Sequence, residues 1–156
     1  MQILRTLTFL AIAASTTSQD MVRPEVVAVT AVIDGGTIAA AGHGRVKLAG
    51  IKAPRVPRGL SPDAAFGRAA KDRLEGIVIR RFVRLEFEPG GTRAYVKLED
   101  GTCVNATLVR EGLAAAEPAA RTSHGSCAAE IVAAEQQARG MRRGIWSARE
   151  PIADKR

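Results

Sequence analysis

Few side chains in this sequence are placed to carry out chemistry, and they do not form a familiar catalytic group. His43 lies between two glycines in an expected turn and His124 lies in an expected loop, where a lone histidine is usually inert. Cys103 and Cys127 each lack a second cysteine or a histidine at the spacing of a metal site. Residue types and spacing alone therefore reveal no general base and no metal-binding cluster.

The most conspicuous chemical property is a surplus of basic side chains. Lysine and arginine outnumber aspartate and glutamate by 23 to 16 in 156 residues, which gives a net charge of +7. This balance favours anionic partners such as nucleic acid or another polyanion. The basic residues are scattered along the chain, so a background composition rich in arginine is the alternative. Apolar residues at 46% and charged residues at 25% indicate one globular domain.

The first 20 residues differ from the rest and resemble a secretory signal peptide. Arg5 precedes an apolar stretch over 7–13, and small and polar residues follow over 14–18. We therefore expect residues 1–20 to be a signal peptide or a disordered leader, and the protein to be exported to the periplasm or secreted. An extension ahead of an internal start at Met21 is the alternative. The apolar stretch is too short to span a bilayer, and no membrane span is expected elsewhere.

Export gives the two cysteines a structural role. A disulfide between Cys103 and Cys127 would close a loop of some two dozen residues and stabilise the fold by roughly 3 kcal/mol. In a cytosolic protein the same residues would be small buried thiols.

Strand and turn signals dominate the first half of the sequence. Residues 25–33 are rich in β-branched side chains, residues 37–38 continue after a turn at 34–36, and residues 45–51 alternate apolar with basic side chains. A proline-containing loop covers 52–60. Three strands joined by tight turns are therefore predicted.

The second half adds helices around two more strands. The Ser-Pro-Asp start at 61–63 predicts a helix whose apolar face carries Phe66, Ala70, Leu74 and Ile77. Strands are predicted at 81–87 and 94–98, helices at 105–113 and 126–139, and a loop between those helices at 117–125. Five short strands and three helices predict a mainly β, α+β fold: a five-stranded β-barrel of the OB type with helices at one end.

A succession of short motifs resembles the staphylococcal nuclease (thermonuclease) family. Residues 32–37 read V-I-D-G-G-T where the family has V-I-D-G-D-T, and residues 45–55 read R-V-K-L-A-G-I-K-A-P-R where it has R-x-R-L-x-G-I-D-A-P-E. Further matches lie at 66–71, 94–96, 100–114, 133–139 and 144–147. The resemblance covers about 25–148, which we expect to be the domain, with 149–156 as a tail. It implies the same barrel fold.

The resemblance also implies a calcium-dependent phosphodiester hydrolase, but its carboxylates are missing here. The family's metal-binding aspartates correspond to Gly36 and Lys52, its proposed glutamate base corresponds to Arg55, and only Asp34 is retained. Calcium requires six to eight oxygen ligands. Like unit charges about 4 Å apart repel by roughly 4 kcal/mol at an effective dielectric of about 20, and more for a divalent ion. We therefore expect no intact catalytic set, no bound metal and no cofactor.

The phosphate-binding arginines have changed as well. The first corresponds to Lys47, which keeps the charge but loses two-pronged hydrogen bonding, and the second corresponds to Gly91. Arg93, directly before Ala94, is close enough to replace the second arginine only if the hairpin turns at a different residue. The tyrosines that stack on the nucleotide base in some family members are absent, and Ala115 and Ala116 stand in that region. Tyr95 and Trp146 are expected in the core instead.

These departures leave three interpretations of the chain, which we expect to be a monomer. The first is a non-catalytic relative that binds nucleic acid or another anion in a metal-free cationic pocket, or whose charges are simply solvated. The pocket would contain Lys47, Lys52, Arg55, Arg58 and Arg93. The second is a working nuclease in which Asp34 positions water without calcium. The third is a protein-interaction module built on the barrel.

Overall fold

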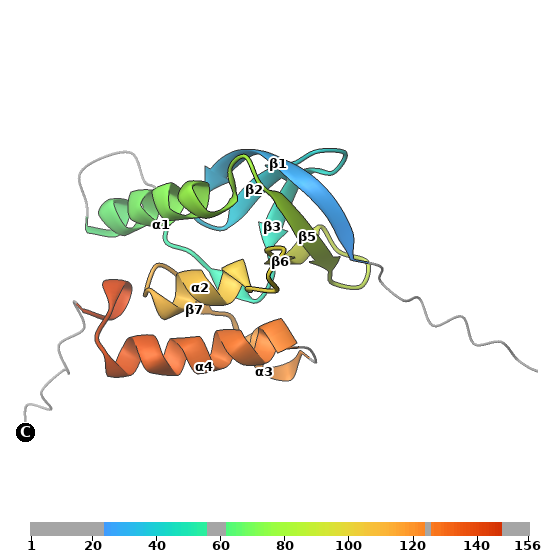
Figure 1. The fold of residues 1–156 in the computed structure, drawn as a ribbon. Coiled ribbons are helices and arrows are strands. Elements are labelled where there is room, and N and C mark those ends of the chain that lie inside the picture. Colours follow the sequence, from blue (N-terminus) through green and yellow to red (C-terminus); the bar gives the residue numbers. More distant parts are fainter. Residues whose placement is uncertain (1–23, 56–61, 124–125, 148–156) are drawn as a thin grey trace, which may run out of the picture.

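The computed structural model describes residues 24–55, 62–123 and 126–147. Strands and helices follow one another as β1 (Glu25–Asp34), β2 (Thr37–Ala40), β3 (Gly44–Leu48), β4 (Ile51–Lys52), α1 (Pro62–Val78), β5 (Phe82–Phe87), β6 (Arg93–Lys97), α2 (Val104–Arg110), β7 (Ala115–Ala116), α3 (Pro118–Thr122), α4 (Ser126–Gly140) and the 3-10 helix η1 (Gly144–Trp146). None of the described helices is long and apolar enough to cross a membrane. Figure 1 shows the barrel strands at the upper right, with α1 to their left and α2, α3 and α4 below them.

Five strands close into a barrel in the order β1-β2-β3-β6-β5. All neighbours are antiparallel except β3 and β6, which run parallel. A small closed barrel with helices packed beside it is the OB-like, α+β architecture that the pattern of strands predicted. The alternation in β3 is confirmed, because Val46 and Leu48 are buried while Arg45 and Lys47 are exposed.

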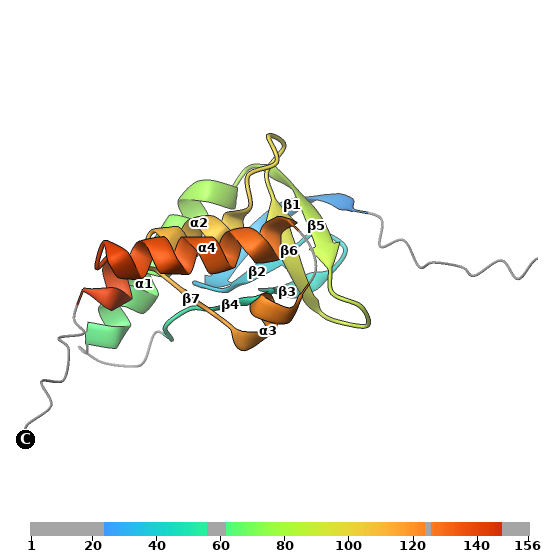
Figure 2. The same ribbon diagram turned by 90° about the horizontal axis from the view of Figure 1, so that it is seen from below.

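Two local predictions are wrong, and both errors lie beside the barrel. The single strand expected over 45–51 breaks after Leu48, because Gly50 adopts a φ of 72° that turns the chain. The next two residues form β4, which pairs with β7 in a separate two-stranded ribbon. The expected loop at 117–125 contains the short helix α3. Figure 2 shows β4, β7 and α3 together along one edge of the molecule.

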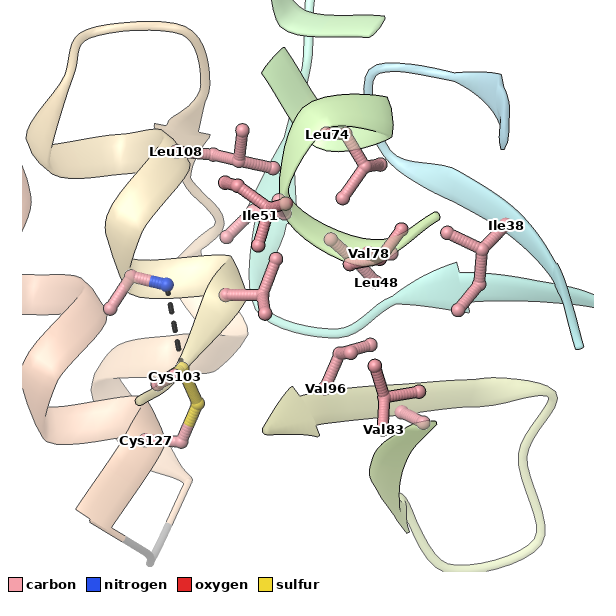
Figure 3. Packing of buried hydrophobic residues seen from close by; sticks show 14 of the residues in the cluster. Ile38, Leu48, Ile51, Leu74, Val78, Val83, Val96, Cys103, Leu108 and Cys127 are labelled. Atoms are coloured by element: carbon pink, nitrogen blue, oxygen red, sulfur yellow. Dashed lines mark hydrogen bonds between the residues drawn. A yellow bond between two sulfur atoms is a disulfide. The ribbon is translucent and has the colours of Figure 1, made fainter. Parts of the chain in front are cut away.

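One continuous core joins the barrel to the helices. Ile38, Leu48 and Val83 fill the barrel, and Leu74 of α1 and Leu108 of α2 reach the same cluster (Figure 3). The predicted inner face of α1 is confirmed by the burial of Ala70, Leu74 and Ile77. Trp146 is buried as expected, and the half-buried Tyr95 packs against the core.

The helices are also fastened covalently. Cys103 and Cys127 form the predicted disulfide, which joins the start of α2 to the start of α4. The Cys103 sulfur additionally accepts a hydrogen bond from the Ala106 amide and so caps α2 (Figure 3). Both cysteines are buried. A bridge across 24 residues stabilises a fold by about 3 kcal/mol.

Candidate functional site

An open groove of about 1020 Å³ lies where the β1–β2 turn, β3, β4 and β6 meet. Every sequence-predicted site residue that the structure describes lines it; these are Asp34, Gly36, Lys47, Lys52, Arg55 and Arg93. Arg58 and His124 lie outside the described residues. Residues separated by up to 59 positions in the printed sequence are thus brought to one surface. The barrel therefore assembles the predicted set.

The β1–β2 turn supplies the acidic end of the groove. Asp34, the last residue of β1, is half-buried, and its Oδ1 accepts a hydrogen bond from the Gly36 amide at 2.8 Å. The Gly36 carbonyl accepts a bond from the Leu48 amide at 2.8 Å, which holds the turn against β3. The carboxylate thus takes part in organising the turn.

Gly36 has room for a side chain, and its neighbour does not. A Cβ on Gly36 would lie 3.6 Å from the Cβ of Ala53 and 3.9 Å from Asp34 Oδ1, both ordinary contacts. A Cβ on Gly35 would lie 2.5 Å from the Cβ of Ala70 in α1. Close packing therefore requires glycine at 35, whereas neither the backbone nor the surroundings require it at 36.

Three cations surround this turn. Lys47 is exposed on β3, Lys52 is exposed on β4, and Arg55 is exposed in the segment that follows. None of the three forms an ion pair with a carboxylate of the described residues. Their charges are consequently available to solvent and to any ligand that enters the groove.

Arg93 also reaches the groove, but it is already engaged. In the parallel register Arg93 lies beside Lys47, and both side chains point away from the barrel interior. The Arg93 guanidinium donates from Nη2 to Glu117 Oε2, and its Nε lies 3.7 Å from Glu88 Oε2. Gly91, predicted from the sequence to stand at the family's second arginine position, lies in the β5–β6 turn, where its amide donates to the Glu88 carbonyl.

Among the described lining residues, Glu117 is the charged one that the sequence did not indicate. It precedes Pro118 at the start of α3, and its amide donates to the Gly50 carbonyl at 2.9 Å. Its side chain makes no capping hydrogen bond and points instead to Arg93. The two residues are 24 positions apart in different elements, so no local pattern could have identified the pair.

A buried acid behind the groove fixes the β4–β7 ribbon. Glu135 of α4 accepts a hydrogen bond from the Ala116 amide at 3.1 Å and pairs with Arg121 at 2.8 Å and Arg139 at 3.3 Å. Arg139 lies 4.1 Å above the ring of Trp146. Since β7 pairs with β4, this network positions the strand that carries Lys52.

The remaining titratable candidates lie elsewhere. His43 pairs with Glu25 at 3.0 Å and its ring centroid is 5.1 Å from that of Phe87, so it is a surface contact of the barrel. Within the described part of the chain, no group of three or more histidine, cysteine, aspartate or glutamate residues is arranged to hold a metal ion.

Known proteins resemble this chain over the same elements. Residues 45–148 match the family described as staphylococcal nuclease homologue. Thermonuclease from Staphylococcus intermedius is 38% identical over 105 residues, which cover 62% of this chain and 62% of that protein. The chain therefore matches less than two thirds of the length of this curated relative. The family match spans β3 through η1, including most of the groove, and the chain belongs to the staphylococcal nuclease homologue family.

Proposed function

We propose that this protein is a non-catalytic member of its family that binds phosphate-rich polyanions, nucleic acid among them, without calcium. The observation that carries the proposal is the position of Lys47, Lys52 and Arg55, three exposed cations around one groove with no acidic partner among the described residues. Such a cluster raises the local concentration of anions and binds phosphate oxygens directly.

The residues that line the groove do not suit calcium. Among the described lining residues, the side-chain carboxylates are those of Asp34 and Glu117. The first accepts the Gly36 amide and the second accepts the Arg93 guanidinium. Lys52 and a second cation, Arg55, offer no oxygen and repel a divalent ion, which needs six to eight oxygen ligands. We therefore do not expect calcium-dependent cleavage by this chain.

The two carboxylates of the described lining are both already engaged, which supports binding without cleavage. Hydrolysis of a phosphodiester requires a positioned and activated water molecule. Within the described lining, Asp34 is the carboxylate without a cationic partner, and it accepts a hydrogen bond from the Gly36 amide. The described lining also holds no aromatic side chain on which a base could stack. Recognition is therefore expected to depend on phosphate and not on base sequence.

The test measures binding and cleavage on the same samples of the oxidised chain. A fluorescent oligothymidylate is titrated with protein in calcium and in chelator, and inorganic polyphosphate serves as competitor. We expect equal binding in both conditions, displacement by polyphosphate, no cleavage, and a log–log salt slope of about −2 to −3 for three to four single-strand phosphate contacts.

A matched pair of variants locates the binding surface. Lys47→Gln, Lys52→Gln and Arg55→Gln together should weaken binding at least tenfold. Arg80→Gln, Arg81→Gln and Arg84→Gln remove the same charge from exposed positions that do not line the groove, and should have a smaller effect. Equal losses would contradict the groove. Cleavage in chelator would favour a metal-free nuclease, and binding without salt dependence would contradict the proposal.

Export is proposed on two grounds. The disulfide suits an oxidising compartment, and residues 1–20, which lie outside the described residues, have the order of a secretory signal. Fractionation of cells that express the full chain, with determination of the mature N-terminus, tests this proposal. A mature protein that remains in the cytosol with Met1 or Met21 at its start would contradict it.

A further inference from the structure

An acid lies inside the cationic groove, and this arrangement is not needed for anion binding. Glu117 accepts a hydrogen bond from Arg93 Nη2, with 25% of the Glu117 side chain and 34% of the Arg93 side chain exposed. Both residues line the groove. The pair is thus within reach of solvent and of any ligand that binds there.

The neighbours of Arg93 explain why an acid is placed beside it. Arg93 and Lys47 are partners in the parallel β3–β6 register, so two like charges project from adjacent positions. Glu117 offsets that repulsion in the free protein. Its backbone is fixed, because its amide donates to the Gly50 carbonyl at 2.9 Å, so the carboxylate stays close to Arg93.

The pair nevertheless leaves hydrogen-bonding capacity unused. Arg93 Nε is buried and has no hydrogen-bond acceptor among the described residues, since Glu88 Oε2 is 3.7 Å away. A guanidinium is best satisfied by two parallel bonds to one carboxylate or phosphate. Glu117 therefore satisfies only part of the hydrogen-bonding capacity of the Arg93 guanidinium. A phosphate group that replaces Glu117 can accept two parallel hydrogen bonds from it.

We propose that Glu117 sets the specificity of the groove by competing with the ligand for Arg93. A ligand with one negative charge does not displace the carboxylate. A polyanion held by Lys47, Lys52 and Arg55 brings further phosphates to Arg93 at high local concentration, displaces Glu117 and recruits a fourth cation. This inference rests on the proposed function of the same groove.

The test is a double-mutant cycle on Glu117 and Arg93, read by binding of oligothymidylate and of inorganic polyphosphate. Glu117→Gln keeps an oxygen that can accept from Arg93, so the fold should be retained. We expect this variant to bind both probes roughly three- to tenfold more tightly, with an unchanged salt slope, because Arg93 contacts a phosphate in both proteins. It should also bind inorganic orthophosphate more tightly than the unmodified protein does. Glu88→Gln is the control and should change affinity less.

The second arm separates competition from a general change in charge. In an Arg93→Gln background, Glu117→Gln should give no gain if Glu117 acts by occupying Arg93. An equal gain in that background would overturn the inference. Unchanged affinity of Glu117→Gln, with salt-dependent binding by the unmodified protein, would overturn it while leaving the proposed function intact. No binding of either probe by any variant would contradict both.

Discussion

Asn105 and Lys52 are polar residues associated with the same segment, 49–52, but Asn105 is buried and Lys52 is exposed. Asn105, on α2, is fully buried and accepts the Val96 amide at 2.9 Å while donating to the Ala49 carbonyl at 2.8 Å. Lys52, only three positions after Ala49, is exposed and has no ion-pair partner among the described residues. The first side chain joins α2 to the barrel, and the second faces the groove.

This difference teaches that fold and chemistry are physically separable in the molecule. A buried polar group that loses its partner costs about 1–3 kcal/mol, so residues such as Asn105 and Glu135 cannot change without penalty. An exposed side chain away from such contacts usually changes stability by about 0.5 kcal/mol or less. The groove can therefore exchange carboxylates for cations while the barrel stays folded.

The largest expected effect comes from reversing the groove charges. Gly36→Asp, Lys52→Asp and Arg55→Glu together should create calcium binding that calorimetry detects and should weaken polyanion binding by more than tenfold. A Cβ at position 36 has room, since its nearest neighbour would be the Ala53 Cβ at 3.6 Å. The neutral set Gly36→Asn, Lys52→Asn and Arg55→Gln is the control. A folded triple variant without calcium affinity would show that the site has been assigned to the wrong residues.

A smaller effect, on stability alone, should distinguish the buried Asn105 from the exposed Lys52. Asn105→Ala leaves the Val96 amide and the Ala49 carbonyl without their partner and should lower the free energy of unfolding by roughly 3 kcal/mol. Lys52→Ala should change it by about 0.5 kcal/mol or less. Urea unfolding of the oxidised proteins measures both values. Similar losses in the two variants would contradict the separation of fold from chemistry.

The smallest expected effect depends on pH and lies far from the groove. The backbone amide of Thr102 donates to Asp100 Oδ1 at 2.9 Å and lowers the pKa of this exposed carboxyl below its usual value. A lowered folded-state pKa stabilises the protein above the unfolded value of about 3.9, and the benefit is lost as pH falls through the folded pKa. The urea midpoint of the unmodified protein should therefore exceed that of Asp100→Ala at neutral pH, with the gap shrinking below about pH 4. A gap that stays constant would contradict this origin.

Periodicity predicted most of the fold because long elements repeat their burial pattern. The alternation through Val46 and Leu48 and the apolar face of α1 both became core. The two-residue strands β4 and β7 and the five-residue helix α3 are too short to show a period. Their existence depends on tertiary contacts, such as the bond from the Ala116 amide to Glu135.

Only part of the groove could be predicted from the sequence, because only residues within recognisable motifs can be identified there. Gly36, Lys47, Lys52 and Arg55 can be identified because they interrupt the family's motifs, and Asp34 because it is retained in one of them; the barrel brings them together. Glu117 interrupts no motif and is recognisable only through its contact with Arg93. The sequence alone does not place Arg93, because its position depends on where the β5–β6 hairpin turns.

The disulfide has a topological consequence for this groove. Cys103 and Cys127 close a covalent ring that contains α2, β7 and α3, and with them Glu117. One wall of the groove thus belongs to a cyclic segment, while Lys47, Lys52 and Arg55 belong to the open chain. A single proteolytic cut anywhere inside the ring leaves both fragments joined until the bridge is reduced. In an environment containing proteases, the wall that carries the acid is retained after the first cleavage.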